Sequence, residues 1–290
     1  MNNIKVFILM ISMMALLVWV GYFFAGQGGM IIAFLIATAM NVVSYWFSDK
    51  LVLKMYKAKE ISESDHPRLY RVVKRVCQNA GNMPMPKVCI VPSKAPNAFA
   101  TGRNEDHAAV AVTEGLLEIL SEDELEGVVA HEIGHIKNKD MLIGTVAATM
   151  AGAIGIIASI ARWGAIFGGY GRSNERGGAA GLIVAAIVAP LIAIIIQMAI
   201  SRQREFKADA RAGRITGKYL PLASALEKLH KAPVRMNLDN KPATAHMMIA
   251  NPLSGKGMSF LFSSHPPYEE RIEKLKVLAQ QSSYAGFNQP

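Results

Sequence analysis

Long runs of apolar residues alternate along this chain with stretches in which hydrophobic and polar positions recur with helical or strand periods. The runs cover residues 4–25, 30–47, 141–167 and 179–200. Each run is close to the roughly 20 residues with which an α-helix crosses a bilayer. A cleaved signal peptide is the alternative for the first run, but the apolar core of such a peptide is only about 7–15 residues long. The pattern therefore predicts four retained transmembrane helices, arranged as two hairpins.

The stretch from 48 to 140 has the mixed periodicity of a folded α+β unit. In "HPRLYRVVKRVCQNAG", apolar side chains recur at helical spacing, basic ones stand opposite, and Gly81 ends the helix. The predicted buried face of this helix is Leu69, Val72, Val73, Val76 and Cys77. The segments "KVCIV", "NAFAT" and "AAVAV" are typical of short strands separated by turns. Ser121 as N-cap and Glu124 as its capping-box partner then open a second helix.

The chain after residue 200 is mostly polar and helical in pattern, apart from 236–258, to which no structure is assigned. We therefore predict a mainly α membrane protein with four transmembrane helices and one α+β domain outside the bilayer. The membrane hairpins are residues 1–47 and 141–200, and the domain is assembled from residues 48–140 and 201–290.

Positive charge clusters at one end of each predicted hairpin. These basic residues are Lys50, Lys54, Lys57, Lys59, Lys137, Lys139, Arg202, Arg204 and Lys207. Because cytoplasmic loops carry the excess of Lys and Arg, both termini and the α+β domain are predicted to face the cytoplasm. Arg172 and Arg176, in the loop between the last two runs, argue weakly for the opposite orientation. The formal net charge of +9 is accordingly assigned to topology and contact with the lipid bilayer, with no nucleic-acid partner.

The candidate chemistry lies in "GVVAHEIGHIKNKD", where His131 and His135 are four residues apart on the capped helix. This spacing puts both imidazoles on one helix face, within reach of one metal ion, and Glu132 beside them can hold a water. A chain of this length would contain the motif by chance roughly 1 time in 100. The helix start and the small residues around the motif favour a catalytic zinc site. Cys77 and Cys89 are too few for a thiolate cage.

A third ligand is needed, because catalytic zinc usually has three protein ligands and a water. If residues 141–200 form an antiparallel hairpin, His135 lies six residues outside one end and Glu205 five residues outside the other. At 1.5 Å per residue these offsets are about 9 and 7.5 Å, so Glu205 is predicted to complete the site. Asp209, one turn further along, can accept a hydrogen bond from a ligand imidazole. The alternative for Glu205 is an ordinary acidic residue near the lipid surface.

Four motifs, in this order and combined with four spans, resemble those of the HtpX-type membrane metalloproteases, a group related to the CAAX prenyl endopeptidases. They are "NAFATG" (97–102), "HEIGHIKNKD" (131–140), "SRQREFKAD" (201–209) and "FSSHPPYEERI" (262–272). The likeness covers nearly the whole chain. It implies a cytoplasmic zincin-like α+β metalloprotease domain and a multi-pass protein of the bacterial inner membrane. It also implies a stress-response role in quality control, with unfolded or misfolded membrane proteins as substrates.

The resemblance also implies residue roles. His131, His135 and Glu205 correspond to the ligands of one Zn²⁺ per chain, Glu132 to the catalytic glutamate, and Asp209 to the support of the zinc site. Asn97, Ala98 and Phe99 lie in the motif that resembles a substrate-binding edge strand, and His265 corresponds to a histidine near the reacting carbonyl. The alternatives are ordinary strand positions for Asn97 and Phe99, and a turn residue for His265.

The predicted activity is hydrolysis of peptide bonds by a zinc metalloendopeptidase. A zinc-binding membrane scaffold without proteolysis is the main alternative, and it gives Glu132 no task. A metal transporter would need ionisable residues inside several spans, where only Lys5 and Arg162 occur. Cleavage of an unfolded protein that a chelator abolishes and zinc restores would separate these classes.

Overall fold

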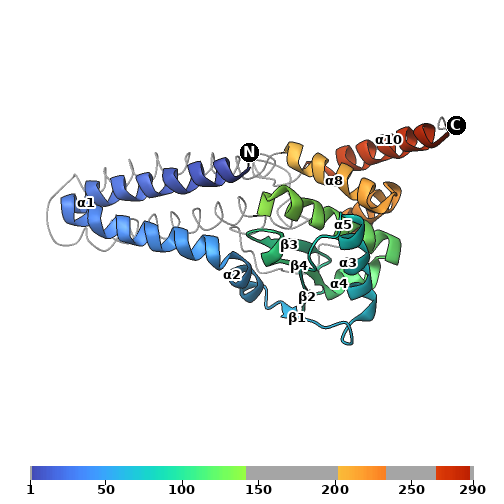
Figure 1. The fold of residues 1–290 in the computed structure, drawn as a ribbon, viewed down its shortest axis with the longest axis horizontal. Helices are drawn as coiled ribbons and strands as arrows, with labels where there is room; N and C mark the ends of the chain where they lie inside the picture. Colours follow the sequence, from blue (N-terminus) through green and yellow to red (C-terminus); the bar gives the residue numbers. More distant parts are fainter. Residues whose placement is uncertain (1, 142–201, 233–265, 288–290) are drawn as a thin grey trace.

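The computed structural model describes residues 2–141, 202–232 and 266–287, which form helices around a small mixed sheet (Figure 1). The N-terminal elements are α1 (Asn2–Trp46), α2 (Ser48–Met55), β1 (Lys59–Glu60), α3 (Pro67–Asn79), β2 (Lys87–Val91), β3 (Ala98–Gly102) and β4 (Ala108–Thr113). They are followed by α4 (Glu114–Ile119), α5 (Glu122–Asn138), α8 (Arg202–Thr216), α9 (Leu220–Lys231) and α10 (Tyr268–Phe287). Nearly all of the two predicted spans at 141–167 and 179–200 lies outside the described residues, as do 236–258 and His265.

The α1 element folds back on itself into two helical arms that project from the rest of the domain (Figure 1). The reversal is at Gly26, whose φ of +58° is a conformation that glycine adopts at little cost. Where the arms meet, a Cβ on Gly21 would lie 2.4 Å from the carbonyl oxygen of Gly29, so only glycine fits there. Asn41 donates from Nδ2 to the carbonyl of Met10 across the arms, at 3.3 Å. The structure thus has a helical hairpin where the sequence predicts one.

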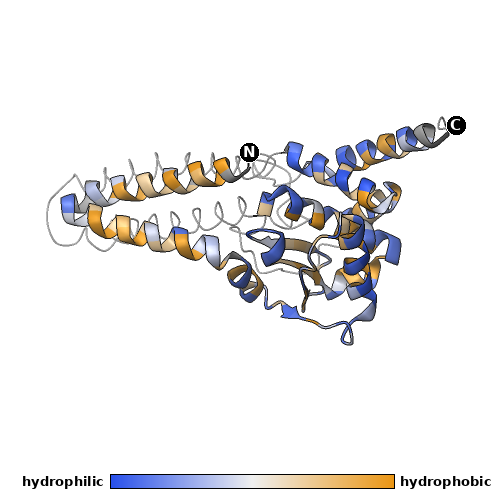
Figure 2. Cartoon of the chain, in the orientation of Figure 1, coloured by the Kyte–Doolittle hydropathy of each residue, from blue (hydrophilic) through white to orange (hydrophobic). Residues whose placement is uncertain are grey.

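The second arm, Gly26–Trp46, is long and apolar enough to cross a membrane, whereas Val6–Tyr22 on the first arm is apolar but shorter. Among the described residues it is the one helix that meets this length. Figure 2 shows hydrophobic residues along both arms and a mixture of polar and apolar residues on the domain. The composition of the hairpin therefore fits a lipid environment, and that of the domain fits water.

The sheet has four strands in the order β1-β2-β4-β3. Strands β2 and β4 are parallel, while β1 pairs with β2, and β3 with β4, in antiparallel register. In that register Phe99 of β3 stands opposite Ala111 of β4. Strand β3 lies at the end of the strand order, so one of its edges has no strand partner among the described residues.

Alternation along the strands divides the buried residues into two cores. The larger core contains Ala98, Ala100, Val110 and Val112 from one face of the sheet, packed with buried residues of α3, α5 and α9. The smaller core lies on the other face of the sheet and joins it to α2. Its members are Val52, Tyr56, Cys89, Val91, Phe99 and Ala111. Strands β2, β3 and β4 therefore lie between the helices that carry the candidate chemistry and the helix that follows the hairpin.

The helix at 67–79 and its five-residue buried face are confirmed, as are the three strands predicted in this region. The capping box is also confirmed, because Ser121 Oγ accepts from the Glu124 amide and Glu124 accepts from the Ser121 amide. Both cysteines are buried free thiols. The two-residue β1 and the six-residue α4 are missing from the sequence prediction because neither is long enough to show a period.

Candidate metal centre

Helix α5 brings the predicted ligands to the centre of the domain because its neighbours approach it closely. A Cβ on Gly127 would lie 3.0 Å from the Leu222 amide nitrogen of α9. One on Gly134 would lie 3.5 Å from Cα of Ala208 in α8. Small residues on one face of α5 therefore let α9 and α8 pack against it at short range. This contact puts Glu205 in the first turn of α8 beside the two histidines.

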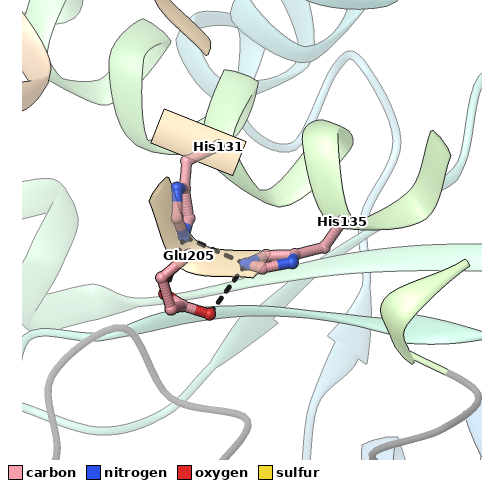
Figure 3. Close-up of side chains that lie close together, drawn as sticks. All are labelled: His131, His135 and Glu205. Atoms are coloured by element: carbon pink, nitrogen blue, oxygen red, sulfur yellow. Dashed lines mark hydrogen bonds and ion pairs between the residues drawn. The ribbon is translucent and has the colours of Figure 1, made fainter. Parts of the chain in front are cut away.

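His131, His135 and Glu205 turn their polar atoms toward one another (Figure 3). The two Nε2 atoms are 3.1 Å apart. His131 Nε2 lies 3.6 Å from Glu205 Oε2, and His135 Nε2 lies 3.4 Å from Glu205 Oε1. Two ligands bound to one tetrahedral zinc at its usual bond lengths are about 3.3 Å apart. Two imidazole nitrogens and a carboxylate are also a usual donor set for catalytic zinc, so these residues fit the ion.

His131 contacts a buried carboxylate, Asp209, which is itself paired with a buried cation, Arg271. Its Nδ1 lies 2.9 Å from Asp209 Oδ1. Arg271 in α10 donates from Nε to Asp209 Oδ2 at 2.9 Å and from Nη2 to Asp209 Oδ1 at 2.7 Å. The third guanidinium nitrogen, Nη1, is 3.6 Å from Glu205 Oε2. Arg271 is fully buried, so this cluster connects three helices through charged side chains.

These contacts shift the pKa values of the buried groups. Burial and Arg271 lower the pKa of His131, but Asp209 and Glu205 outweigh them and raise it to about 9. Burial raises the pKa of Asp209, but Arg271 and His131 outweigh it and lower the value to about 2. The two side chains therefore stabilise each other's charge. A carboxylate on the far nitrogen of an imidazole also fixes the ring tautomer that a metal needs.

His135 has a second, looser carboxylate behind it. Its Nδ1 lies 3.3 Å from Asp140 Oδ2, and its side chain is 13% exposed, where that of His131 is fully buried. Asp140 is itself buried, and Lys139 before it ends α5 in a left-handed conformation, with φ of 57°. Sequence reasoning missed this role of Asp140, although the residue follows His135 by five positions.

Arg271 was also missed as part of the site, although the quoted "FSSHPPYEERI" motif contains it. In sequence it looks like one more charge on a polar helix. The available signal was chemical: Glu205 and Asp209 were both predicted at one site, and two buried carboxylates need a cationic partner.

The remaining predicted residues differ in how they are placed. Glu132 lies on α5 beside its histidines and is 4% exposed. The amide of Asn97 donates to Thr113 Oγ1 at 2.8 Å, and its own Oδ1 accepts from the Ala98 amide. The Phe99 ring packs on Tyr56 in the smaller core, 5.1 Å between centroids, on the sheet face away from α5. The Phe99 side chain therefore lies on the side of the sheet away from the two histidines.

Comparison with known proteins supplies a family. A model described as peptidase family M48 matches residues 63–279. A protein named "Protease HtpX homolog" from Desulfatibacillum aliphaticivorans is 54% identical over 286 residues, covering 98% of this chain and 92% of that relative. One of the same name from Pyrococcus furiosus is 53% identical over 275 residues, covering 94% of this chain and 95% of the relative.

A solved structure resembles the fold of this chain. The crystal structure of S. mikatae Ste24p matches with a TM-score of 0.51 at 17% identity and covers 94% of this chain. The match covers 62% of the Ste24p chain, so this chain spans less than two thirds of its length. At this identity the likeness concerns the fold alone.

Proposed function

The chain belongs to peptidase family M48 and is an HtpX-type zinc metallopeptidase, and on this premise we propose that it is a membrane-bound endopeptidase acting on unfolded proteins. The proposed substrates are misfolded or damaged membrane proteins, cleaved on the cytoplasmic side of a bacterial inner membrane under stress. The carrying observation is the cluster of His131, His135 and Glu205, whose polar atoms lie within 4.8 Å of one another. The family assignment favours this proposal over a non-proteolytic scaffold.

The proposed ligands of one zinc are His131, His135 and Glu205. Zinc so bound supplies Lewis acidity to a peptide carbonyl and lowers the pKa of a water toward about 7. Glu132 is proposed as the general base that takes the water's proton and passes it to the leaving amine. Asp209 accepts a hydrogen bond from the Nδ1 proton of His131, and Arg271 donates hydrogen bonds to Asp209. His265, which lies outside the described residues, is proposed as the donor to the carbonyl oxygen.

Strand β3 is the proposed binding site of an extended substrate. An unfolded segment can add to a free strand edge through main-chain hydrogen bonds, which recognise backbone and not sequence. The end position of β3 in the sheet, next to α5, supports this role for Asn97, Ala98 and Phe99. A backbone-reading site suits an enzyme whose substrates share only the loss of their fold.

The decisive test compares two buried acids of the same helix. Glu132→Gln should retain zinc and lose turnover of casein in detergent by a factor of about 100 or more. Glu126→Gln is the matched control, since Glu126 is 6% exposed on α5 and pairs with Arg75 outside the site. A chelator should abolish wild-type cleavage, and added zinc should restore it. Equal turnover by wild type and Glu132→Gln would contradict the proposed base.

Zinc content tests the ligand assignment separately. Glu205→Ala should lower the zinc that remains bound after purification, because it removes one of three protein ligands. Unchanged stoichiometry, measured by elemental analysis against wild type, would remove Glu205 from the site.

A further inference from the structure

The helix that follows the hairpin exposes an unusual surface stripe. Phe47, just before α2, and Lys50, Leu51 and Lys54 within it are spaced i, i+3, i+4 and i+7, so they share one face. All four are exposed, Phe47 and Leu51 each by 46%. A helix in water buries its apolar residues, whereas a helix at a membrane surface exposes apolar residues with lysines beside them.

A cation from another element extends this stripe. Arg103, in the turn between β3 and β4, lies over the Trp46 ring at 4.5 Å and donates to the Trp46 carbonyl at 3.3 Å. Trp46 ends the apolar arm and is 51% exposed. The acidic residue of α2 is Asp49, in its first turn. The cations of α2 and Arg103 thus lie on either side of Trp46 and Phe47 in the fold, where α1 ends and α2 begins. Figure 1 shows this junction between the hairpin and the domain.

We propose that the stripe formed by Phe47, Lys50, Leu51 and Lys54, together with Arg103, binds the anionic lipid headgroups of the bilayer that holds α1. Continuity with the hairpin and the sign of the charge both select this partner. The proposal rests on the membrane location within the proposed function. Each lysine close to an anionic surface strengthens binding about fivefold.

Lipid binding at this stripe reaches the proposed substrate strand. Val52 on the opposite face of α2 and Tyr56 just after the helix are 4% and 8% exposed and pack in the smaller core. Tyr56 contacts Phe99 of β3 there, and Arg103 immediately follows the last residue of β3. Headgroups that bind α2 and Arg103 would therefore restrain β3 at two places. One is the contact of Tyr56 with Phe99 on the sheet face toward α2, and the other is Arg103 at the C-terminal end of the strand. Anionic lipid is expected to favour substrate binding, lowering KM more than it changes kcat.

The first test locates the stripe directly. Leu51→Cys is labelled with a fluorophore in the full chain, and its quenching is measured in vesicles containing brominated lipid. Cys77 and Cys89 are buried, and burial raises both thiol pKa values to about 11, so they react poorly. Val277→Cys on α10 is the control, since Val277 is 45% exposed. Quenching at position 51 alone is expected, and equal quenching at both positions, or none at 51, would overturn the proposal.

The second test measures activity in vesicles of pure phosphatidylcholine and in vesicles with about 30% phosphatidylglycerol. The wild type should gain about three- to tenfold in kcat/KM on a neutral unstructured peptide when anionic lipid is present. Lys50→Glu with Lys54→Glu should lose this gain and keep its activity in detergent. Arg71→Glu with Lys74→Glu makes the same charge change on exposed positions of α3, away from the hairpin (Figure 1), and should keep the gain.

The outcomes separate the two proposals. Absence of chelator-sensitive cleavage in detergent would contradict the proposed function. Normal cleavage in detergent without a lipid effect would overturn the lipid surface alone. Equal stimulation by soluble glycerol phosphate in neutral vesicles would identify a free-anion site and would likewise overturn it. Loss of the gain in the α3 control would show that overall charge, and not the stripe, causes the effect.

Discussion

The two ends of helix α5 both bury carboxylates, and they satisfy them in different ways. At the N-terminal end, Glu124 accepts from the Ser121 amide at 2.8 Å, from Ser224 Oγ at 2.7 Å and from Lys228 Nζ at 2.7 Å. At the C-terminal end, the Nε2 atoms of His131 and His135 face each other and Glu205 across 3.1 to 3.6 Å. The first cluster pairs each acceptor with a protein donor. The second directs several ligand atoms at one small volume, as expected of a metal site.

The difference separates a buried polar cluster that is complete in itself from one whose ligand atoms need a cation. A complete network rigidifies the elements it joins, whereas converging ligand atoms repel or compete until a cation separates them. Helix α5 therefore connects a network that is complete without an ion to one that an ion completes.

The largest effect is expected from removing the buried arginine. Arg271→Met leaves the Asp209 carboxylate without its main partner and should lower the free energy of unfolding by about 3–5 kcal/mol. Arg75→Met is the matched control, because Arg75 also pairs with two carboxylates but is 46% exposed, and it should cost about 0–1 kcal/mol. Chemical unfolding in detergent measures both. Equal costs would mean that the site cluster adds no more to the fold than a surface pair.

Removal of zinc should cause the next largest loss of stability. This loss should depend only on the residues at the C-terminal end of α5. At free zinc about 1,000 times Kd, binding stabilises the folded state by about 4 kcal/mol, which a chelator should remove. His135→Ala should no longer respond to the chelator. Glu124→Gln should respond like wild type, because its cluster has no part in metal binding. Melting curves of the three proteins with and without chelator give the comparison.

The two carboxylates behind the histidines should differ in their effect on zinc affinity. Asp209→Asn should weaken zinc binding about 10- to 100-fold, because the His131–Asp209 contact is short and fully buried. Asp140→Asn should cost less than about tenfold, because its contact with His135 is longer and that ring is partly exposed. Competition with a chromophoric chelator measures both affinities. A larger loss of zinc affinity in Asp140→Asn than in Asp209→Asn would contradict this prediction.

The smallest effect concerns the closed network at the N-terminal end. Burial raises the pKa of Glu124, but Lys228, the Ser121 amide and Ser224 outweigh it and lower the value from 4.5 to about 2. A depressed carboxyl pKa stabilises the fold above pH 4.5, and this contribution is lost as the pH falls toward 2. Wild type should exceed Glu124→Gln by about 1–2 kcal/mol at pH 6, keep part of this advantage at pH 3, and approach the variant only near pH 2. A difference that does not change with pH would refute the charged form of Glu124 as the cause.

Sequence reasoning predicted the elements and residues that depend on local rules. Ser121 and Glu124 stand three residues apart, and the buried face of α3 recurs with the helical period, so both could be found without a fold. Glu205 was found from a length argument, and the structure brings it to the histidines, although the hairpin used in that argument lies outside the described residues. The bacterial inner membrane and the four-span count stay predictions.

Sequence reasoning missed the residues whose role depends on packing. Arg271 belongs to the site because α10 lies against α8, and no spacing rule connects position 271 to position 209. Asp140 was taken only as part of a polar stretch outside the bilayer, because a turn at Lys139 had to be known before its side chain could be placed beside His135. Strand β1 is defined only by its pairing with β2, and two residues are too few to predict a strand from the sequence.

The close approach of Gly134 to Ala208 has a consequence for how tightly the site can bind its ion. Two ligands come from α5 and one from α8, so the spacing of these helices sets the distance between the ligand atoms. A Cβ at position 134 would lie 3.5 Å from its neighbour, so alanine would be accommodated, but a bulkier residue would push the helices apart. The three ligand atoms could then no longer all reach one zinc at bond lengths of about 2.0–2.2 Å, and zinc affinity would fall. A residue without a side chain thus helps to set the affinity of the metal site.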